Sequence, residues 1–196
     1  MNDDQIITIN TEDVVEKGFV TPEVHDLFQL VHESDPILKE VMPEFDFNNS
    51  PVNPSDFAST LVETCKARHG LGLSANQCGF RYRVFVMGHG DEYVAFFNPK
   101  LISSKGEVHM PEGCLTFPFM MLRITRPETI EVEYQDYEGN KKTATYSGMS
   151  ARCWLHELDH QNGIVYTSRA KPMALKSGME KKAKLMKRIS KIPRFN

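Results

Sequence analysis

The segment His156-Glu157-Leu158-Asp159-His160 is an H-E-x-x-H motif, whose residue types can bind a metal ion and move a proton. Residues four apart lie one above the other on a helix face, so both imidazoles of this motif can reach one ion. Glu157 would then lie beside the ion, where it could act as a general base toward a metal-bound water. A chain with 7 His residues produces this motif only rarely by chance. We therefore interpret it as part of a divalent metal site.

A catalytic metal site of this kind usually needs a third protein ligand, and the sequence offers candidates of different types. The metzincin pattern H-E-x-x-H-x-x-G-x-x-H is excluded, because Gly163 fits but Tyr166 stands at the last position. A gluzincin would use a downstream Glu. The candidate is Glu180, although its neighbour Lys181 makes this a poor environment for a buried ligand. A thiolate from upstream is the third option, and Cys114 could supply it, since a Cys bound to a divalent metal is deprotonated.

A glycine-rich segment from Gly70 to Gln77 has the sequence G-L-G-L-S-A-N-Q. It satisfies the relaxed dinucleotide-binding pattern G-x-G-x-x-A, which must follow a strand and open a helix. Here a helix is predicted before the segment and a strand after it, so we reject nucleotide binding. Paired glycines would instead allow another backbone to approach closely, and Gln77 offers a neutral amide donor.

Together and in this order, the glycine-rich segment, the segment Glu112–Thr116 around Cys114 and the H-E-x-x-H segment resemble the motifs of the peptide deformylase family: G-x-G-L-A-A-x-Q, E-G-C-L-S and H-E-x-D-H. The chain has Ser74 for the first Ala and Thr116 for the final Ser, and it keeps the third motif unchanged. The segment Ser34–Lys39 is similar to the D-P-x-L-R sequence near the start of these enzymes. The resemblance covers roughly residues 28–170.

The resemblance implies a hydrolase that removes the N-terminal formyl group from formyl-methionyl nascent peptides and releases formate. It implies that Cys114, His156 and His160 hold one divalent metal ion per chain. Fe²⁺ is the expected native ion, and Zn²⁺, Ni²⁺ and Co²⁺ suit the same ligands. Metal-bound water would attack the formyl carbon, with Glu157 as general base and later general acid. Gln77 and the backbone N–H of Leu115 would bind the formyl oxygen.

Substrate-binding residues and a supporting ion pair are implied by the same resemblance. The substrate would add as a strand, and its methionine side chain would enter a pocket partly formed by the helix that carries the motif. Two candidates, Met149 and Cys153, are seven and three residues before His156 and share its helix face, which fits a pocket or simple core packing equally well. The residues concerned are Leu71, Gly72 and Gly113 for the backbone, Leu71, Met149 and Cys153 for the pocket, and Glu112 with Arg126 as the supporting pair.

The chain also departs from the family pattern close to the proposed site. Leu155 stands where Gln is common, and Gln161 stands where Leu is common. Arg152 replaces an apolar residue that many relatives have near the pocket mouth, which predicts an altered substrate preference beyond methionine. None of the three is a proposed ligand, base or oxyanion donor.

The composition predicts a single folded domain with short appendages. The chain has 196 residues, of which 40% are hydrophobic and 25% charged, as in ordinary globular proteins. No apolar run approaches the ~18 residues of a membrane-spanning helix. The four cysteines form no C-x-x-C pair, and the acidic start lacks the features of a secretion signal. We therefore expect a cytoplasmic protein without membrane contact.

The charge distribution divides the chain into three parts. We predict an acidic N-terminal extension at residues 1–27, a catalytic domain at 28–170 and a basic tail at 171–196. The tail holds nine Lys or Arg residues against Glu180, although the whole chain carries −3. Such a block is either a solvated face or a contact for an anionic surface, and the ribosome would be the partner here. No DNA partner is indicated, and we expect a monomer.

The pattern of elements predicts an α+β fold, in which antiparallel strands surround the central helix that carries the motif. An apolar stripe after the capping pair Asn53-Pro54 predicts a helix that ends near Gly70. Alternating residues joined by a turn signature predict a hairpin. The expected strands are Tyr82–Met87, Tyr93–Asn98 (ended by Asn98-Pro99), Thr129–Gln135 and Lys141–Ser147, and the other helices are Ser147–Gln161 and Ala174–Lys191.

Two other functions stay open at this stage. The first is a gluzincin-like metalloendopeptidase that uses Glu180 as the third ligand. The second is a ribosome- or RNA-binding protein whose metal is structural and whose basic tail binds the partner. The three motifs in order favour the deformylase interpretation over both.

Overall fold

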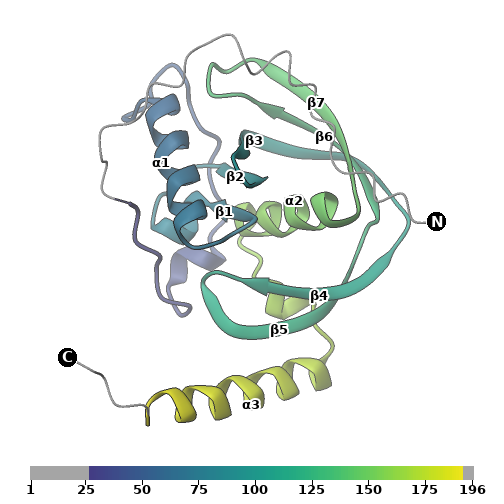
Figure 1. Ribbon diagram of the computed structural model, residues 1–196. Coiled ribbons are helices and arrows are strands. Elements are labelled where there is room, and N and C mark those ends of the chain that lie inside the picture. The colour runs from purple at the N-terminus through teal and green to yellow at the C-terminus, as the bar shows by residue number, and fades with distance from the viewer. Residues whose placement is uncertain (1–26, 192–196) are drawn as a thin grey trace.

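Two antiparallel sheets enclose one central helix in the computed structural model, which describes residues 27–191 (Figure 1). The larger sheet has the strand order β1-β2-β3-β6-β7, and the smaller one pairs β4 with β5. The fold is therefore α+β, as predicted. The strands are β1 (Gly72–Ser74), β2 (Val84–His89), β3 (Glu92–Lys105), β4 (Val108–Cys114), β5 (Phe117–Arg126), β6 (Thr129–Gln135) and β7 (Lys141–Ser147). The helices are α1 (Pro54–Ala67), α2 (Gly148–Gln161) and α3 (Pro172–Ile189), with short 3-10 helices η2 (Pro36–Lys39), η3 (Ala75–Cys78) and η4 (Tyr166–Arg169).

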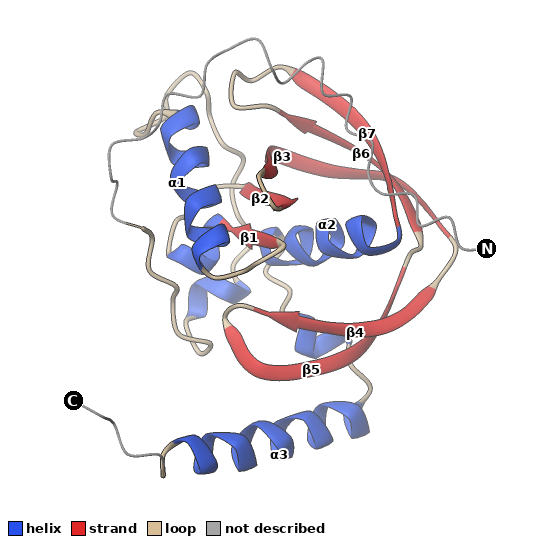
Figure 2. Ribbon diagram, viewed as in Figure 1, coloured by secondary structure: helices blue, strands red, loops and turns tan. Residues whose placement is uncertain are grey.

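Helix α2 carries the H-E-x-x-H motif through the interior of the domain. It contacts β1, β2, β6 and β7 of the larger sheet, and the β4-β5 hairpin passes on its other side (Figure 2). Every residue from Trp154 to Gln161 is buried. The chain leaves the helix at Gly163, whose φ is +68° and where a Cβ would lie 2.6 Å from the Lys39 carbonyl oxygen. A glycine is thus needed where α2 ends.

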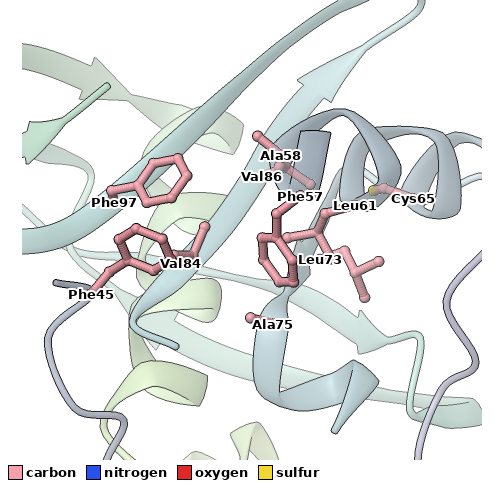
Figure 3. Packing of buried hydrophobic residues seen from close by; sticks show 10 residues of the cluster. All are labelled: Phe45, Phe57, Ala58, Leu61, Cys65, Leu73, Ala75, Val84, Val86 and Phe97. Carbon is pink, nitrogen blue, oxygen red and sulfur yellow. The ribbon is translucent and has the colours of Figure 1, made fainter. Parts of the chain in front are cut away.

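Helix α1 forms where its cap and apolar stripe predict it. The Asn53 side chain accepts hydrogen bonds from the backbone N–H groups of Ser55 (2.9 Å) and Asp56 (3.3 Å), and Pro54 occupies the first turn. The buried face of α1 packs on residues of β1 and β2, as the sticks of Figure 3 show. This contact anchors the strand that follows the paired glycines. The cluster consists of Phe45, Phe57, Ala58, Leu61, Cys65, Leu73, Ala75, Val84, Val86 and Phe97.

The prediction that a strand ends at Asn98-Pro99 is wrong, because β3 continues to Lys105. The pairing of β3 with β6 shifts register between Phe97 and Lys100, so Pro99 lies at an irregularity where a missing N–H costs little. Asn98 has a φ of +49°, and its side chain bonds both the N–H (2.7 Å) and the carbonyl (3.0 Å) of Phe45. The dipeptide therefore interrupts the regular pairing of the strand instead of ending it.

The β4-β5 hairpin was not predicted, because both of its faces carry apolar residues. On β5, Met120, Leu122 and Ile124 are buried, whereas Phe119 and Met121 between them are exposed. This arrangement hides the alternation that normally indicates a half-buried strand. The inward face also holds polar residues, Glu112 on β4 and Arg126 on β5, which the site requires.

The remaining predicted elements agree closely with the structure. The β6-β7 hairpin has the predicted bounds, and α2 begins one residue later than predicted. Helix α3 lies against β5, where Gly178 packs on Leu122 and Met120. Within residues 27–191, no helix is both long and apolar enough to span a bilayer. Most of the predicted extension, residues 1–26, lies outside the described residues, so its structure stays a prediction.

Candidate metal centre

The side chains of Cys114, His156 and His160 converge between β4 and α2. One ligand atom from each of the three lies within 4.8 Å of the others, and this is the only such group of His, Cys, Asp or Glu within residues 27–191. The Cys114 Sγ lies 3.4 Å from the His160 Nε2. Glu180 lies on the exposed surface of α3 and does not belong to the group. The structure thus brings together the ligands that the family resemblance implies.

The donor set and its charges fit a divalent transition metal. A thiolate with two imidazoles is a ligand set that such ions bind well. Burial lowers the pKa of His160 and so keeps its imidazole neutral, as a metal ligand must be. Burial would also lower the pKa of His156, but hydrogen bonds with Cys114 and Glu112 raise it to about 10. The anionic neighbours Cys114 and Glu112 thus favour positive charge at His156.

Glu112 fixes the orientation of the His156 ring. Its Oε1 accepts a hydrogen bond from His156 Nδ1 at 2.7 Å, which leaves Nε2 as the nitrogen available to a metal. Burial would raise the pKa of Glu112, but hydrogen bonds from Arg126 and His156, together with their charges, hold it well below its usual range. This shift favours the ionised form of Glu112 behind the proposed ligand His156.

Arg126 joins Glu112 to the middle of α2. Its guanidinium donates to both Glu112 oxygens, at 2.7 and 2.6 Å, and its Nη1 donates to Asp159 at 2.8 Å. Asp159 also accepts two hydrogen bonds from Arg169 in η4. All of Arg126, Glu112 and Asp159 are buried, so this network is shielded from solvent.

The prediction that Arg152 lies near the mouth of a substrate pocket is wrong. Arg152 is buried, and its guanidinium donates to Glu112 Oε2 at 2.9 Å and to the Val108 carbonyl at 2.8 Å. A long cation on the inward face of α2 finds its anionic partner on β4 instead of reaching solvent. The expected effect of Arg152 on substrate preference therefore has no structural basis. Leu155, the other departure before His156, packs in the core between α2 and the larger sheet.

Glu157 is buried beside the converging ligands. Burial raises its pKa to about 7, against the opposing effects of His156 and of a hydrogen bond from the Ser74 hydroxyl. A Cβ on Gly72 would lie 2.6 Å from Glu157 Oε1, so the carboxylate lies directly against the backbone of β1. Because β1 is the edge strand of its sheet, a general base at this position would face a peptide that adds to that edge.

Gln77 is held with its amide nitrogen toward the ligand group. Its Oε1 accepts a hydrogen bond from the Ser74 N–H at 2.8 Å. Its Nε2 donates to Thr116 Oγ1 at 3.0 Å and lies 3.4 Å from the Cys114 Sγ. Leu115 follows Cys114 directly at the end of β4. Both proposed oxyanion donors thus lie beside the proposed ligands.

The candidate substrate-binding residues fall into two groups. Cys153 lies close to the proposed base, since a Cβ on Gly72 would contact both its Sγ (2.9 Å) and Glu157. Leu71 and Met149 are 44% and 48% exposed, so both side chains are accessible from solvent. The Leu71 carbonyl accepts a hydrogen bond from the Gly88 N–H, so this oxygen is directed toward β2. Gly113 lies against the Met121 side chain on the outer face of the hairpin.

Three polar residues of the site were missed at the sequence level. Asp159 is part of the third motif, and its position beside His160 could have indicated a role. Ser74 stands at a motif position, so its difference from the family pattern was visible but its partner was not. Arg169 had no local signal, because its partner Asp159 is brought close only by the turn after α2.

Comparisons with known proteins agree with this geometry. A family model described as polypeptide deformylase matches residues 27–176. A peptide deformylase from Caldanaerobacter subterraneus subsp. tengcongensis is 32% identical over 136 residues, which cover 69% of this chain and 84% of that protein. The crystal structure of peptide deformylase from Thermotoga maritima is 31% identical with a TM-score of 0.71, covering 76% of this chain and 100% of that one. The crystal structure of a peptide deformylase from Legionella pneumophila is 25% identical with a TM-score of 0.76, covering 85% and 99%.

Removing the charge of Arg126 should strongly destabilise the protein. Arg126→Met takes away two hydrogen bonds of the buried Glu112 carboxylate and one of Asp159, and removing one partner of a buried ion pair typically costs about 3–5 kcal/mol. The matched control is Arg81→Met, because Arg81 makes a similar two-bond contact with Glu40 on the exposed surface. Urea unfolding of both variants measures the difference. Equal decreases in the free energy of unfolding of the two variants would show that the buried network contributes no more than an exposed ion pair.

The third metal ligand can be identified by substitution. Cys114→Ala should lose most of the bound metal, since two imidazoles alone bind divalent ions weakly. Glu180→Ala should keep it, because Glu180 is exposed on α3. Metal content after anaerobic purification, measured by mass spectrometry, distinguishes the two. The reverse result would support the gluzincin alternative.

Proposed function

Because the chain belongs to the polypeptide deformylase family and removes the N-terminal formyl group from nascent peptides, we propose that Glu157 moves the proton in this reaction and Gln77 binds the formyl oxygen. The observation that carries this proposal is the buried Glu157 carboxylate beside the convergent group of Cys114, His156 and His160. Neither alternative is favoured, since the family model covers the motifs of a deformylase and Glu180 lies outside the ligand group.

Members of this family are metal-dependent, and we propose that Cys114, His156 and His160 hold Fe²⁺ in the native protein. The chemistry that a bound divalent cation supplies here is Lewis acidity, which polarises the formyl carbonyl and makes water nucleophilic at neutral pH. Glu112 supports this arrangement by holding His156 through Nδ1. Mass spectrometry of the unmodified protein after anaerobic purification identifies the bound ion.

The proposed reaction is hydrolysis of the formyl amide, with Glu157 as the proton carrier. Water adds to the formyl carbon while Glu157 accepts its proton. The amide nitrogen then takes that proton from Glu157 as the carbon–nitrogen bond breaks, which releases formate and a peptide with a free amine. A pKa near 7 suits a group that must both accept and donate a proton at neutral pH.

The developing oxyanion would be stabilised by two donors. Gln77 Nε2 is already held beside Cys114, and the backbone N–H of Leu115 is the next group along the chain. Removing one such donor typically raises the barrier by about 3–4 kcal/mol. Since Gln77 is fixed by Ser74 and Thr116 before substrate arrives, little reorganisation is needed. The substrate peptide would pair with the edge strand β1 at Gly72, and with Gly113 on β4.

We also propose how the parts of the chain divide the work. Residues 28–170 would carry catalysis, and the basic tail at 171–196 would contact the ribosome, where formylated nascent chains emerge. In support, the Lys and Arg residues on α3 other than Lys182 are exposed, whereas Lys182 pairs with Glu33 and anchors the helix. The acidic extension at residues 1–27 would be separate from both. We propose that the protein acts as a monomer in the cytoplasm.

Replacing the proposed base should abolish turnover without removing the metal. Glu157→Gln keeps the size of the side chain but cannot accept a proton, so formate release from formyl-Met-Ala-Ser should fall by at least about 10²–10⁴-fold. The control is Glu63→Gln, which changes an exposed residue on α1. Both variants should retain the metal content of the unmodified protein. Substantial turnover by Glu157→Gln would show that another group moves the proton.

Neutralising α3 should weaken ribosome binding in a salt-dependent way. The variant replaces Lys181, Lys184, Lys187 and Arg188 by Gln and keeps Lys182, so the helix stays anchored. Each lost phosphate contact reduces the dependence of the binding constant on salt. Cosedimentation with purified bacterial ribosomes at several salt concentrations measures this salt dependence. The control is a variant that is neutralised at exposed lysines of β3 and β7. Equal binding by both variants would refute the contact.

A further inference from the structure

We propose that the hydroxyl group of Ser74 is a positioning group for the reaction, because it holds the Glu157 carboxylate in the orientation that proton transfer needs. This inference rests on the proposed function, in which Glu157 is the base. Ser74 is fully buried at the end of β1, where the glycine-rich segment meets α2. Its Oγ lies 2.8 Å from Glu157 Oε2.

The hydroxyl proton of Ser74 has two possible acceptors, and the carboxylate is the better one. Oγ lies 2.8 Å from Glu157 Oε2 but 3.2 Å from the Glu157 backbone carbonyl. A hydrogen bond to an ionised acceptor is also shorter and stronger than one to a neutral carbonyl. The hydroxyl has a single proton, so the bond to the carboxylate dominates.

No other side chain or backbone N–H within residues 27–191 donates a hydrogen bond to the Glu157 carboxylate. Its second oxygen, Oε1, is limited by the backbone of Gly72, where a Cβ would lie only 2.6 Å away. One oxygen is therefore fixed by Ser74, and the other lies against the edge strand to which a substrate would add. Without the Ser74 hydroxyl, the Glu157 carboxylate would stay beside β1 but could rotate away from its present orientation.

Ser74 also holds Gln77, but through its backbone. The Ser74 N–H donates to Gln77 Oε1 at 2.8 Å, and this bond does not depend on the side chain. Ser74→Ala therefore removes the contact with Glu157 and the capping contact of the Ser74 side chain with the Gln77 N–H, and it keeps the bond that holds the Gln77 amide. Because Ala is the family's own residue at this motif position, the fold should accept the substitution.

The experiment measures kcat and KM for formate release from formyl-Met-Ala-Ser by the metal-loaded protein and its Ser74→Ala variant. We expect kcat to fall about tenfold, the effect of losing one hydrogen bond to a charged group, while KM changes less than about twofold. Metal content and melting temperature should match those of the unmodified protein. Ser50→Ala, which removes the hydroxyl of a partly buried serine that bonds only to Val52, should leave all four quantities unchanged.

A second background separates positioning from a merely structural role. In Glu157→Asp the side chain is shorter by one methylene group, so its carboxylate lies farther from the Ser74 hydroxyl. Adding Ser74→Ala to this variant should change kcat less than about twofold, because the contact is already lost.

Three results would overturn the inference. The first is equal kcat in Ser74→Ala and the unmodified protein. The second is the same tenfold loss whether Ser74→Ala is introduced into the unmodified protein or into the Glu157→Asp variant, and the third is a loss of metal that accounts for the loss of turnover. An unmodified protein that loads metal but releases no formate would instead overturn the proposed function, and the inference with it.

Discussion

The ion pair between Glu112 and Arg126 joins the two halves of the site, because each partner also bonds to the central helix, Glu112 to His156 and Arg126 to Asp159. A carboxylate buried without a partner would be strongly destabilising, so Glu112 requires cations on the inward face of the hairpin and of α2. Arg126 and Arg152 provide them, and Arg126 continues to Asp159 on α2. His156 then receives its orientation from the same carboxylate. The electrostatic requirement of one buried anion thereby fixes the position of a proposed metal ligand.

The same region contains a second buried carboxylate whose surroundings have the opposite effect. Glu112 is surrounded by guanidinium groups, and its pKa is held below the usual range. Glu157 is also buried, but its only hydrogen-bond donor among the described residues is the neutral Ser74 hydroxyl, and burial raises its pKa to about 7. Two acids close together thus acquire different roles from their environments alone. One is a fixed anion that supports structure, and the other can exchange a proton.

The sequence predicted the features that depend on neighbouring residues. The spacing of His156 and His160 follows from helix geometry, and the bounds of the β6-β7 hairpin follow from strict alternation and a turn signature. The features it could not predict depend on residues far apart in the chain. Asn98 bonds to Phe45 at a register shift within β3, and Arg152 turns inward to Glu112. The β4-β5 hairpin was hidden because its outer face is also apolar. The sequence shows the local periodicity of apolar residues, but it does not show the distant residues whose contacts change the structure that this periodicity predicts.

Close packing explains why three short and distant segments indicated one site. A Cβ on Gly70 would lie 2.8 Å from the Leu115 side chain, and one on Gly72 would lie 2.6 Å from Glu157 Oε1. The first motif must therefore be small at these positions, because the second and third motifs occupy the adjacent space. In return, its Ser74 and Gln77 make polar contacts with Glu157 and Cys114. Each segment supplies either the space or the hydrogen bond that another needs, so a change in one motif has to be matched in the others.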